Sequence, residues 1–139
     1  MNTTQRIGTI LVRVVVALVF VIHGLARVRL GLVDEFGVLL GQFGVPTPTV
    51  TAWVITAAEV LGGLTLAAGL GVVWLCGWFA LELAVGIALV HASHGWFVVG
   101  PGRGGMEYSV VLMTSLAAVA LMHGPGQVRA TLRLIRPRR

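Results

Sequence analysis

The sequence contains little charge: charged residues make up 11% of its 139 residues, against about 25% in soluble domains. Hydrophobic residues make up 57%, and the mean hydropathy is +0.95. This composition excludes an ordinary soluble domain and indicates an integral membrane protein. The length fits a single transmembrane domain over residues 1–139 and leaves no room for a separate soluble one.

Lysine is absent, so all ten basic residues are arginine. Half of these arginines lie in the last eleven residues, within a basic tail over residues 127–139. No RNA- or DNA-binding motif accompanies the charge, so we do not expect nucleic-acid binding. A basic tail next to apolar runs is typical of contact with anionic lipid.

Redox motifs are also absent. The single cysteine, Cys76, has no second thiol in the chain, which excludes an intrachain disulfide and a CxxC relay. We interpret Cys76 as a small buried hydrophobic residue. The sequence has no haem-attachment motif, iron–sulfur spacing or dinucleotide fingerprint of the kind that flavin and nicotinamide enzymes carry. Electrons for a redox reaction would therefore come from a partner chain.

Four long apolar runs are present, at about residues 7–26, 50–70, 72–92 and 106–123. Each is close to the roughly 20 residues that a membrane-spanning helix needs. Arg13 interrupts the first run and no cleavage site follows it, so we predict a retained helix and not a signal peptide. The short link at residues 69–72 predicts an antiparallel hairpin. The fold class is therefore all-α, a bundle of four transmembrane helices with up-down topology.

The arginines predict the orientation in the membrane. An even number of spans places both termini on one side, and that side holds six arginines. The opposite loops hold Arg27, Arg29 and Arg103 together with Asp34 and Glu35. Because basic residues favour the cytoplasmic side, we predict a multi-pass cell-membrane protein with both termini in the cytoplasm. Part of the first outer loop, residues 36–43, has the pattern of a short interfacial helix.

Two charged residues, Arg13 and Glu59, fall deep in the predicted membrane. At 1.5 Å per residue, Arg13 lies about 5 Å from the midpoint of its run and Glu59 within about 2 Å. A buried carboxylate needs a partner because of the cost of placing a charge in the bilayer. Arginine binds carboxylates well, so we predict an Arg13–Glu59 pair. The alternative is that Arg13 reaches the cytoplasmic headgroups.

An outer polar layer contains His23, His91 and Glu107, each about 10–13 Å from the midpoint of its run. Three interpretations remain open. The side chains could cross-link helix ends, they could hydrogen-bond a small polar ligand such as quinone and handle its protons, or they could bind a divalent metal.

Glu82 lies near the midplane of the third run. At 100° per residue it falls on the opposite face of that helix from His91. We therefore expect it to face an oligomer interface or an accessory subunit, or to be protonated.

The polar residues form an ordered set of short motifs. These are Arg13, His23-Gly24 and Arg27 in the first run, Glu59-Val60-Leu61-Gly62-Gly63 in the second, His91 and Gly95-Trp96-Phe97 after the third, and Glu107-Tyr108 and Gly124-Pro125-Gly126 around the fourth. Their order and spacing resemble the DoxX family of small four-helix membrane proteins. The resemblance covers about residues 13–126.

This resemblance implies a redox role, since relatives include the membrane subunit of a thiosulfate:quinone oxidoreductase and membrane partners of oxidative-stress proteins. The leading hypothesis is a redox-associated membrane protein that binds quinone through His23, His91 and Glu107, or a membrane subunit of an oxidoreductase. Whether the chain is itself an enzyme stays open, as does a homo-oligomer. The alternatives are a non-catalytic scaffold that recruits an oxidoreductase through the basic tail, and a small-solute or proton-coupled carrier that uses Glu59.

Overall fold

The computed structural model describes residues 2–135, with side chains through residue 124, and helices are the only regular secondary structure in this part of the chain. Four of its helical segments are long and apolar enough to cross a membrane, which confirms the predicted fold class. The elements are α1 (Thr3–Arg29), α2 (Val33–Gln42), α3 (Pro48–Ala67), α4 (Val72–Gly86), a π-helical turn (Ile87–His91), a 3₁₀ turn (Ala92–His94) and α5 (Glu107–Ile135).

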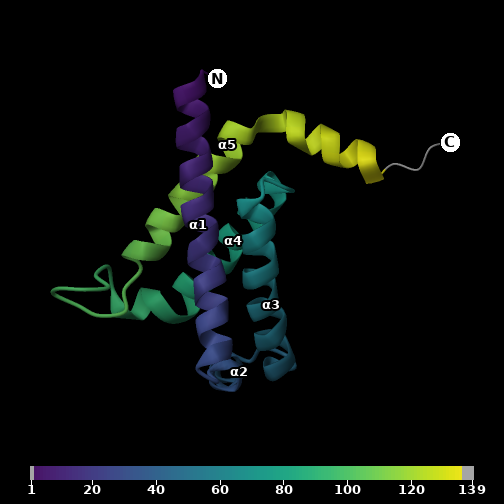
Figure 1. Ribbon diagram of the computed structural model, residues 1–139. Helices are drawn as coiled ribbons and strands as arrows, with labels where there is room; N and C mark the ends of the chain where they lie inside the picture. Colours follow the sequence, from purple (N-terminus) through teal and green to yellow (C-terminus); the bar gives the residue numbers. More distant parts are fainter. Residues whose placement is uncertain (1, 136–139) are drawn as a thin grey trace.

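The helices alternate in direction along the bundle (Figure 1). Helices α1 and α3 lie side by side, and α4 and α5 pack against each other. The N-terminus and the α3–α4 turn lie at one end, while α2 lies at the other end, packed against α3. The arrangement is therefore up-down, as the even number of apolar runs predicts.

Helix α1 is longer than its apolar run predicts, because it ends at Arg29. Nothing in the sequence breaks the helix before Gly31, whose φ of +70° is a conformation that glycine adopts readily. Arg27 and Arg29 lie in the last turn, where the helix dipole favours positive charge. As a result, Arg27 belongs to a helix of the bundle and not to the outer loop.

The core lies where α1, α3, α4 and α5 meet. Phe20 of α1 and Phe79 of α4 stack with ring centroids 4.0 Å apart. Cys76 is buried beside them, as expected for a small hydrophobic residue. Other members of this cluster are Val16, Ala17, Leu66, Val72, Leu116 and Val119.

Two glycines allow α1 and α3 to approach closely. A Cβ atom added to Gly24 of α1 would lie 3.1 Å from the Thr56 carbonyl oxygen, and one added to Gly63 of α3 would lie 3.0 Å from the Ala17 carbonyl oxygen. Small residues of this kind permit close helix contact in membranes. Gly62, next to Gly63, serves the α3–α4 contact, since its added Cβ would lie 3.2 Å from the Phe79 ring.

Two departures from α-helical geometry change helix direction or phase. The π turn at Ile87–His91 follows α4 without a break. It widens the helix locally, so the 100° spacing no longer relates residues on either side of it. In α5, Gly124 has φ 58° and ψ 177°, and the helix beyond it turns away from the bundle (Figure 1).

Candidate functional site

A buried salt bridge joins α1 to α3. Arg27 Nη1 lies 2.7 Å from Glu59 Oε2, and Arg27 Nη2 donates to Glu59 Oε1 at 3.2 Å. The two side chains are 11% and 4% exposed. This bidentate arrangement is the geometry in which arginine binds carboxylates most strongly. It gives Glu59 the partner that a carboxylate at membrane depth requires.

Two further groups fix the position of the Arg27 guanidinium. Its Nη1 also donates to Thr56 Oγ1 at 2.8 Å, while that hydroxyl donates to the Ala52 carbonyl at 2.8 Å. The guanidinium carbon lies 4.2 Å from the ring centroid of Phe36 in α2, which adds a cation–π contact. Groups from α2 and α3 thus hold one cation of α1 in place.

The predicted Arg13–Glu59 pair is wrong, because the helix register places these residues at different depths. Gly24 is the α1 residue level with Glu59, since its added Cβ would lie 3.2 Å from Glu59 Cβ. Arg13 lies eleven residues away along α1, which is about 16 Å. The prediction ended the first helix at residue 26, so it left Arg27 out of consideration.

Arg13 instead contacts neutral groups at the other end of α1. Its Nη1 lies 2.9 Å from His123 Nε2, and its Nη2 donates to the Ala67 carbonyl at 3.2 Å. His123 Nδ1 lies 2.8 Å from the Val119 carbonyl oxygen, an acceptor, so Nδ1 carries a proton and Nε2 accepts from Arg13. Arg13 therefore links α1 to the ends of two other spans.

Glu82 of α4 faces the salt bridge. Its carboxyl group lies within hydrogen-bonding range of Glu59 and close to the charge of Arg27. Its Oε2 is fully buried and receives no hydrogen bond from a donor among residues 2–124. Glu82 therefore does not point away from the bundle, as an oligomer interface or an accessory subunit would require, and the π turn after α4 alters its angular relation to His91. The third expectation, a protonated Glu82, stays a prediction.

The pairing of Glu59 with Glu82 follows from the hairpin. Glu59 lies ten residues before Gly69, and Glu82 lies ten residues after Val72. Helices joined by a tight turn place residues at equal distances from that turn at the same depth. Gly62 and Phe79, which are in contact, lie three residues nearer the turn than Glu59 and Glu82. They are therefore also at equal distances from the turn. The equal distances from the turn therefore predict this pair from the sequence. The prediction that Glu82 lies on the face opposite His91 argues against it.

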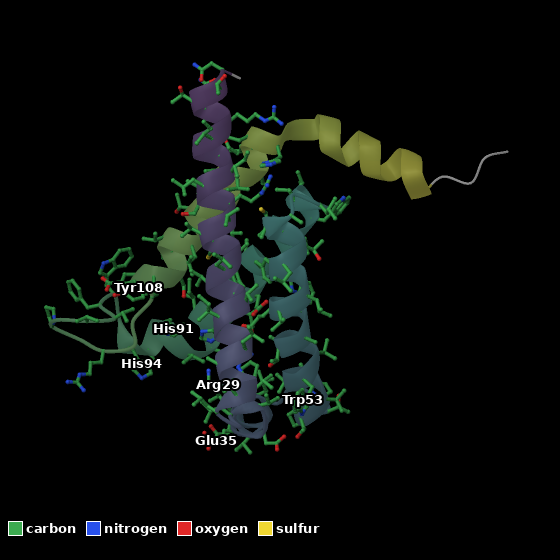
Figure 2. The ribbon with its side chains drawn as sticks, viewed as in Figure 1. Arg29, Glu35, Trp53, His91, His94 and Tyr108 are labelled. Carbon is green, nitrogen blue, oxygen red and sulfur yellow. The ribbon has the colours of Figure 1, made fainter. Side chains whose placement is uncertain are left out.

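A cavity of about 370 Å³ lies beside Arg27, between α1 and α2. Arg27 and Phe36 line it, and His23 and Glu35 add polar groups. Its remaining lining residues are Ala26, Leu30, Leu32 and Leu39. In Figure 2, Glu35 lies at the end of the molecule that α2 covers. The cavity is open to its surroundings, and its lining is mostly apolar with a few polar groups, a composition typical of small-molecule sites.

Of the predicted outer residues, the structure places only His23 at this cavity. His91 Nδ1 lies 2.7 Å from the Gly104 carbonyl oxygen, and Glu107 Oε1 accepts from the Val98 amide at 3.1 Å. Both contacts hold the loop between α4 and α5, and Figure 2 shows His91, His94 and Tyr108 on that side. Among the residues described, no three metal-ligating side chains are gathered closely enough to bind an ion.

The cavity can offer hydrogen-bond donors to a ligand. Arginine has five N–H donors, and three of those of Arg27 bond to Glu59 and Thr56. The remaining donors are not used by these three bonds, and Arg27 is one of the residues that line the cavity. A neutral ligand with carbonyl acceptors and an apolar ring matches this wall, because Glu59 already neutralises the charge.

Comparisons with known proteins agree with these observations. A family model described as DoxX matches residues 8–92, which is more than half of the chain. A protein of Bacillus subtilis (strain 168), named "Putative oxidoreductase CatD", is 30% identical over 123 residues. That match covers 87% of this chain and 83% of the relative. No solved structure is a significant match.

Proposed function

The chain belongs to the DoxX family, and from this premise we propose that it is a redox-associated membrane protein that binds a quinone in the cavity beside Arg27. The observation that carries the proposal is the position of this arginine. Its charge is neutralised by Glu59, and it is one of the residues that line a mostly apolar cavity. A neutralised arginine beside apolar side chains favours an uncharged ligand that has a ring and carbonyl groups.

The other lining residues suit the same ligand. Phe36 and the leucines give the flat apolar surface that a quinone ring requires, and His23 provides a second group for hydrogen bonding. Histidine is also the side chain best suited to exchange protons near neutral pH. The cavity lies between the last turn of the first span and an amphipathic helix, so a lipid-soluble molecule can reach it from the membrane.

A partner chain completes the proposal, because the sequence contains no redox motif. The relative from Bacillus subtilis is itself named as a putative oxidoreductase, which is consistent with a redox role beside a partner chain. We infer that the protein spans the cell membrane with both termini in the cytoplasm, where the basic tail would be available to that partner. The side chains of this tail lie outside the described residues. Deleting residues 127–139 should reduce co-purification of the partner while leaving quinone affinity unchanged.

Binding of a menaquinone analogue to the purified protein tests the proposal. We expect His23→Ala and Phe36→Leu each to weaken binding about tenfold, equivalent to about 1.4 kcal/mol. His94→Ala, which alters a histidine of the other loop, is the matched control and should leave affinity unchanged.

The same experiment decides the role of the other outer residues. His91→Ala should affect binding less than His23→Ala if the ligand occupies the cavity beside Arg27. A stronger effect of His91→Ala would move the site to the α4–α5 loop, and an absence of binding by the unmodified protein would overturn the proposal.

A further inference from the structure

The centre of the bundle contains more carboxyl groups than cations. Arg27 provides one positive charge, and Glu59 and Glu82 face it from two other helices. If both carboxyl groups were ionised, this region would have a net charge of −1 at membrane depth, which is costly. A proton on one of them would remove the excess charge.

The hydrogen-bond geometry indicates where that proton lies. Both Glu59 oxygens accept from Arg27, so Glu59 is held as a carboxylate. Glu82 lies in hydrogen-bonding range of Glu59, and a bond between two carboxyl groups requires that one of them donate a proton. Glu82 Oε2 is fully buried and receives no hydrogen bond from a donor in the described part of the chain. This is where an ionised Glu82 would lack compensation.

We propose that Glu82 and Glu59 share one proton, and that this buried proton-binding site controls how many Arg27 donors face the cavity. With the proton present, Arg27 bonds to Glu59 and Thr56, which leaves its remaining donors free for a ligand. When the proton leaves, Glu82 becomes a second anion that competes for the same guanidinium. Fewer donors then remain for a carbonyl ligand, so its affinity falls. This second step rests on the proposed function, whereas the shared proton does not.

The groups that face Glu82 are few, which keeps the titration simple. They are Glu59 on α3 and Arg27 on α1. Helix α5 also packs on α4, but among the residues described it adds no charged group to this contact. The site should therefore bind and release a single proton.

Infrared spectroscopy of the protein in lipid vesicles tests the shared proton without any ligand. The carbonyl stretch of a protonated carboxyl group is separate from that of carboxylates, and labelling glutamate with ¹³C at its carboxyl group identifies it. We expect this band at neutral pH, its shift in D₂O, and its loss through a one-proton transition as the pH rises.

Two variants locate the proton. Glu82→Gln keeps the shape of a protonated Glu82 and should fold, yet it should lose the band. Glu35→Gln, in an exposed residue, should keep it. Absence of the band in the unmodified protein would overturn the proposal, as would its persistence in Glu82→Gln. The titration of the unmodified protein remains decisive if a variant does not fold.

Affinity for a menaquinone analogue tests the link to the cavity. Above the transition, affinity should fall by up to tenfold per pH unit, the slope of a one-proton linkage. In Glu82→Gln this pH dependence should disappear. Binding that depends on pH equally in both proteins would overturn the link. No binding at any pH would overturn the proposed function, while the infrared band would still report the shared proton.

Discussion

The two arginines of α1 that enter the bundle have opposite environments. Arg27 is paired with a carboxylate, a hydroxyl and an aromatic ring. Arg13 has an imidazole nitrogen and a backbone carbonyl as its contacts. Its Nε is buried with no hydrogen-bond partner in the described residues. The two residues are fourteen positions apart, so they lie on nearly the same face of the helix but about 21 Å apart in depth.

The difference separates two ways to keep an arginine in a membrane. At Arg27 the charge is neutralised locally, and the site can lie deep among helices. At Arg13 the charge is not neutralised by an anion within the described residues, but it lies at the carboxyl-terminal end of α3, whose dipole favours cations. The first arrangement places a neutralised arginine beside the cavity, and the second holds helix ends together.

The largest expected effect comes from breaking the neutralised pair. Glu59→Gln should lower the free energy of unfolding by up to about 3 kcal/mol, because removing one partner of a buried pair leaves a charge that Glu82 can offset only by giving up its proton. Unfolding by denaturant in mild detergent measures the change. The double variant Arg27→Leu with Glu59→Leu should recover most of the loss, since an apolar pair of similar volume is often neutral. A double variant as unstable as Glu59→Gln would contradict a paired charge.

Removing Arg13 should have a smaller effect. Arg13→Gln loses two hydrogen bonds to neutral groups, and each is worth about 1 kcal/mol, so we expect a loss of about 1–2 kcal/mol in the same measurement. The change should leave binding of a menaquinone analogue intact, because Arg13 does not line the cavity. A loss as large as that of Glu59→Gln would mean that an anion also neutralises Arg13.

The smallest effect should come from the partner of Arg13. His123→Gln keeps a side-chain oxygen that can accept from Arg13, so the free energy of unfolding should fall by no more than about 1 kcal/mol. His123→Leu removes the acceptor and should cost more. Equal stability of the two variants would show that the Arg13–His123 contact contributes nothing.

The sequence predicts the fold well because each spanning helix needs a long apolar run, and composition reports such runs directly. It locates Glu59 in the bundle for the same reason. The apolar run ends at residue 26, three residues before the end of α1, so the sequence places Arg27 in a loop and not beside Glu59. Two adjacent helices can also pair in several registers, and the sequence alone does not select among them. Here Gly24 and Gly63 make that choice through contacts that only the structure shows.

The candidate site shows a second limit. Depth along each run places His23, His91 and Glu107 in one layer, but depth does not give the position around the bundle. His91 and Glu107 lie beside a glycine-rich loop whose backbone groups their side chains bond, whereas His23 lies near α2. The π turn, which the sequence does not signal, changes the angle between Glu82 and His91 around the third span.

Gly24 is uncharged, yet it affects the strength of the ion pair between Arg27 and Glu59. Coulomb attraction weakens as the separation of the two groups grows, and the absent side chain of Gly24 allows α1 and α3 to bring Arg27 and Glu59 into direct contact. Any larger residue at this position would push the helices apart and stretch the pair. A substitution that changes only volume would then act as an electrostatic mutation.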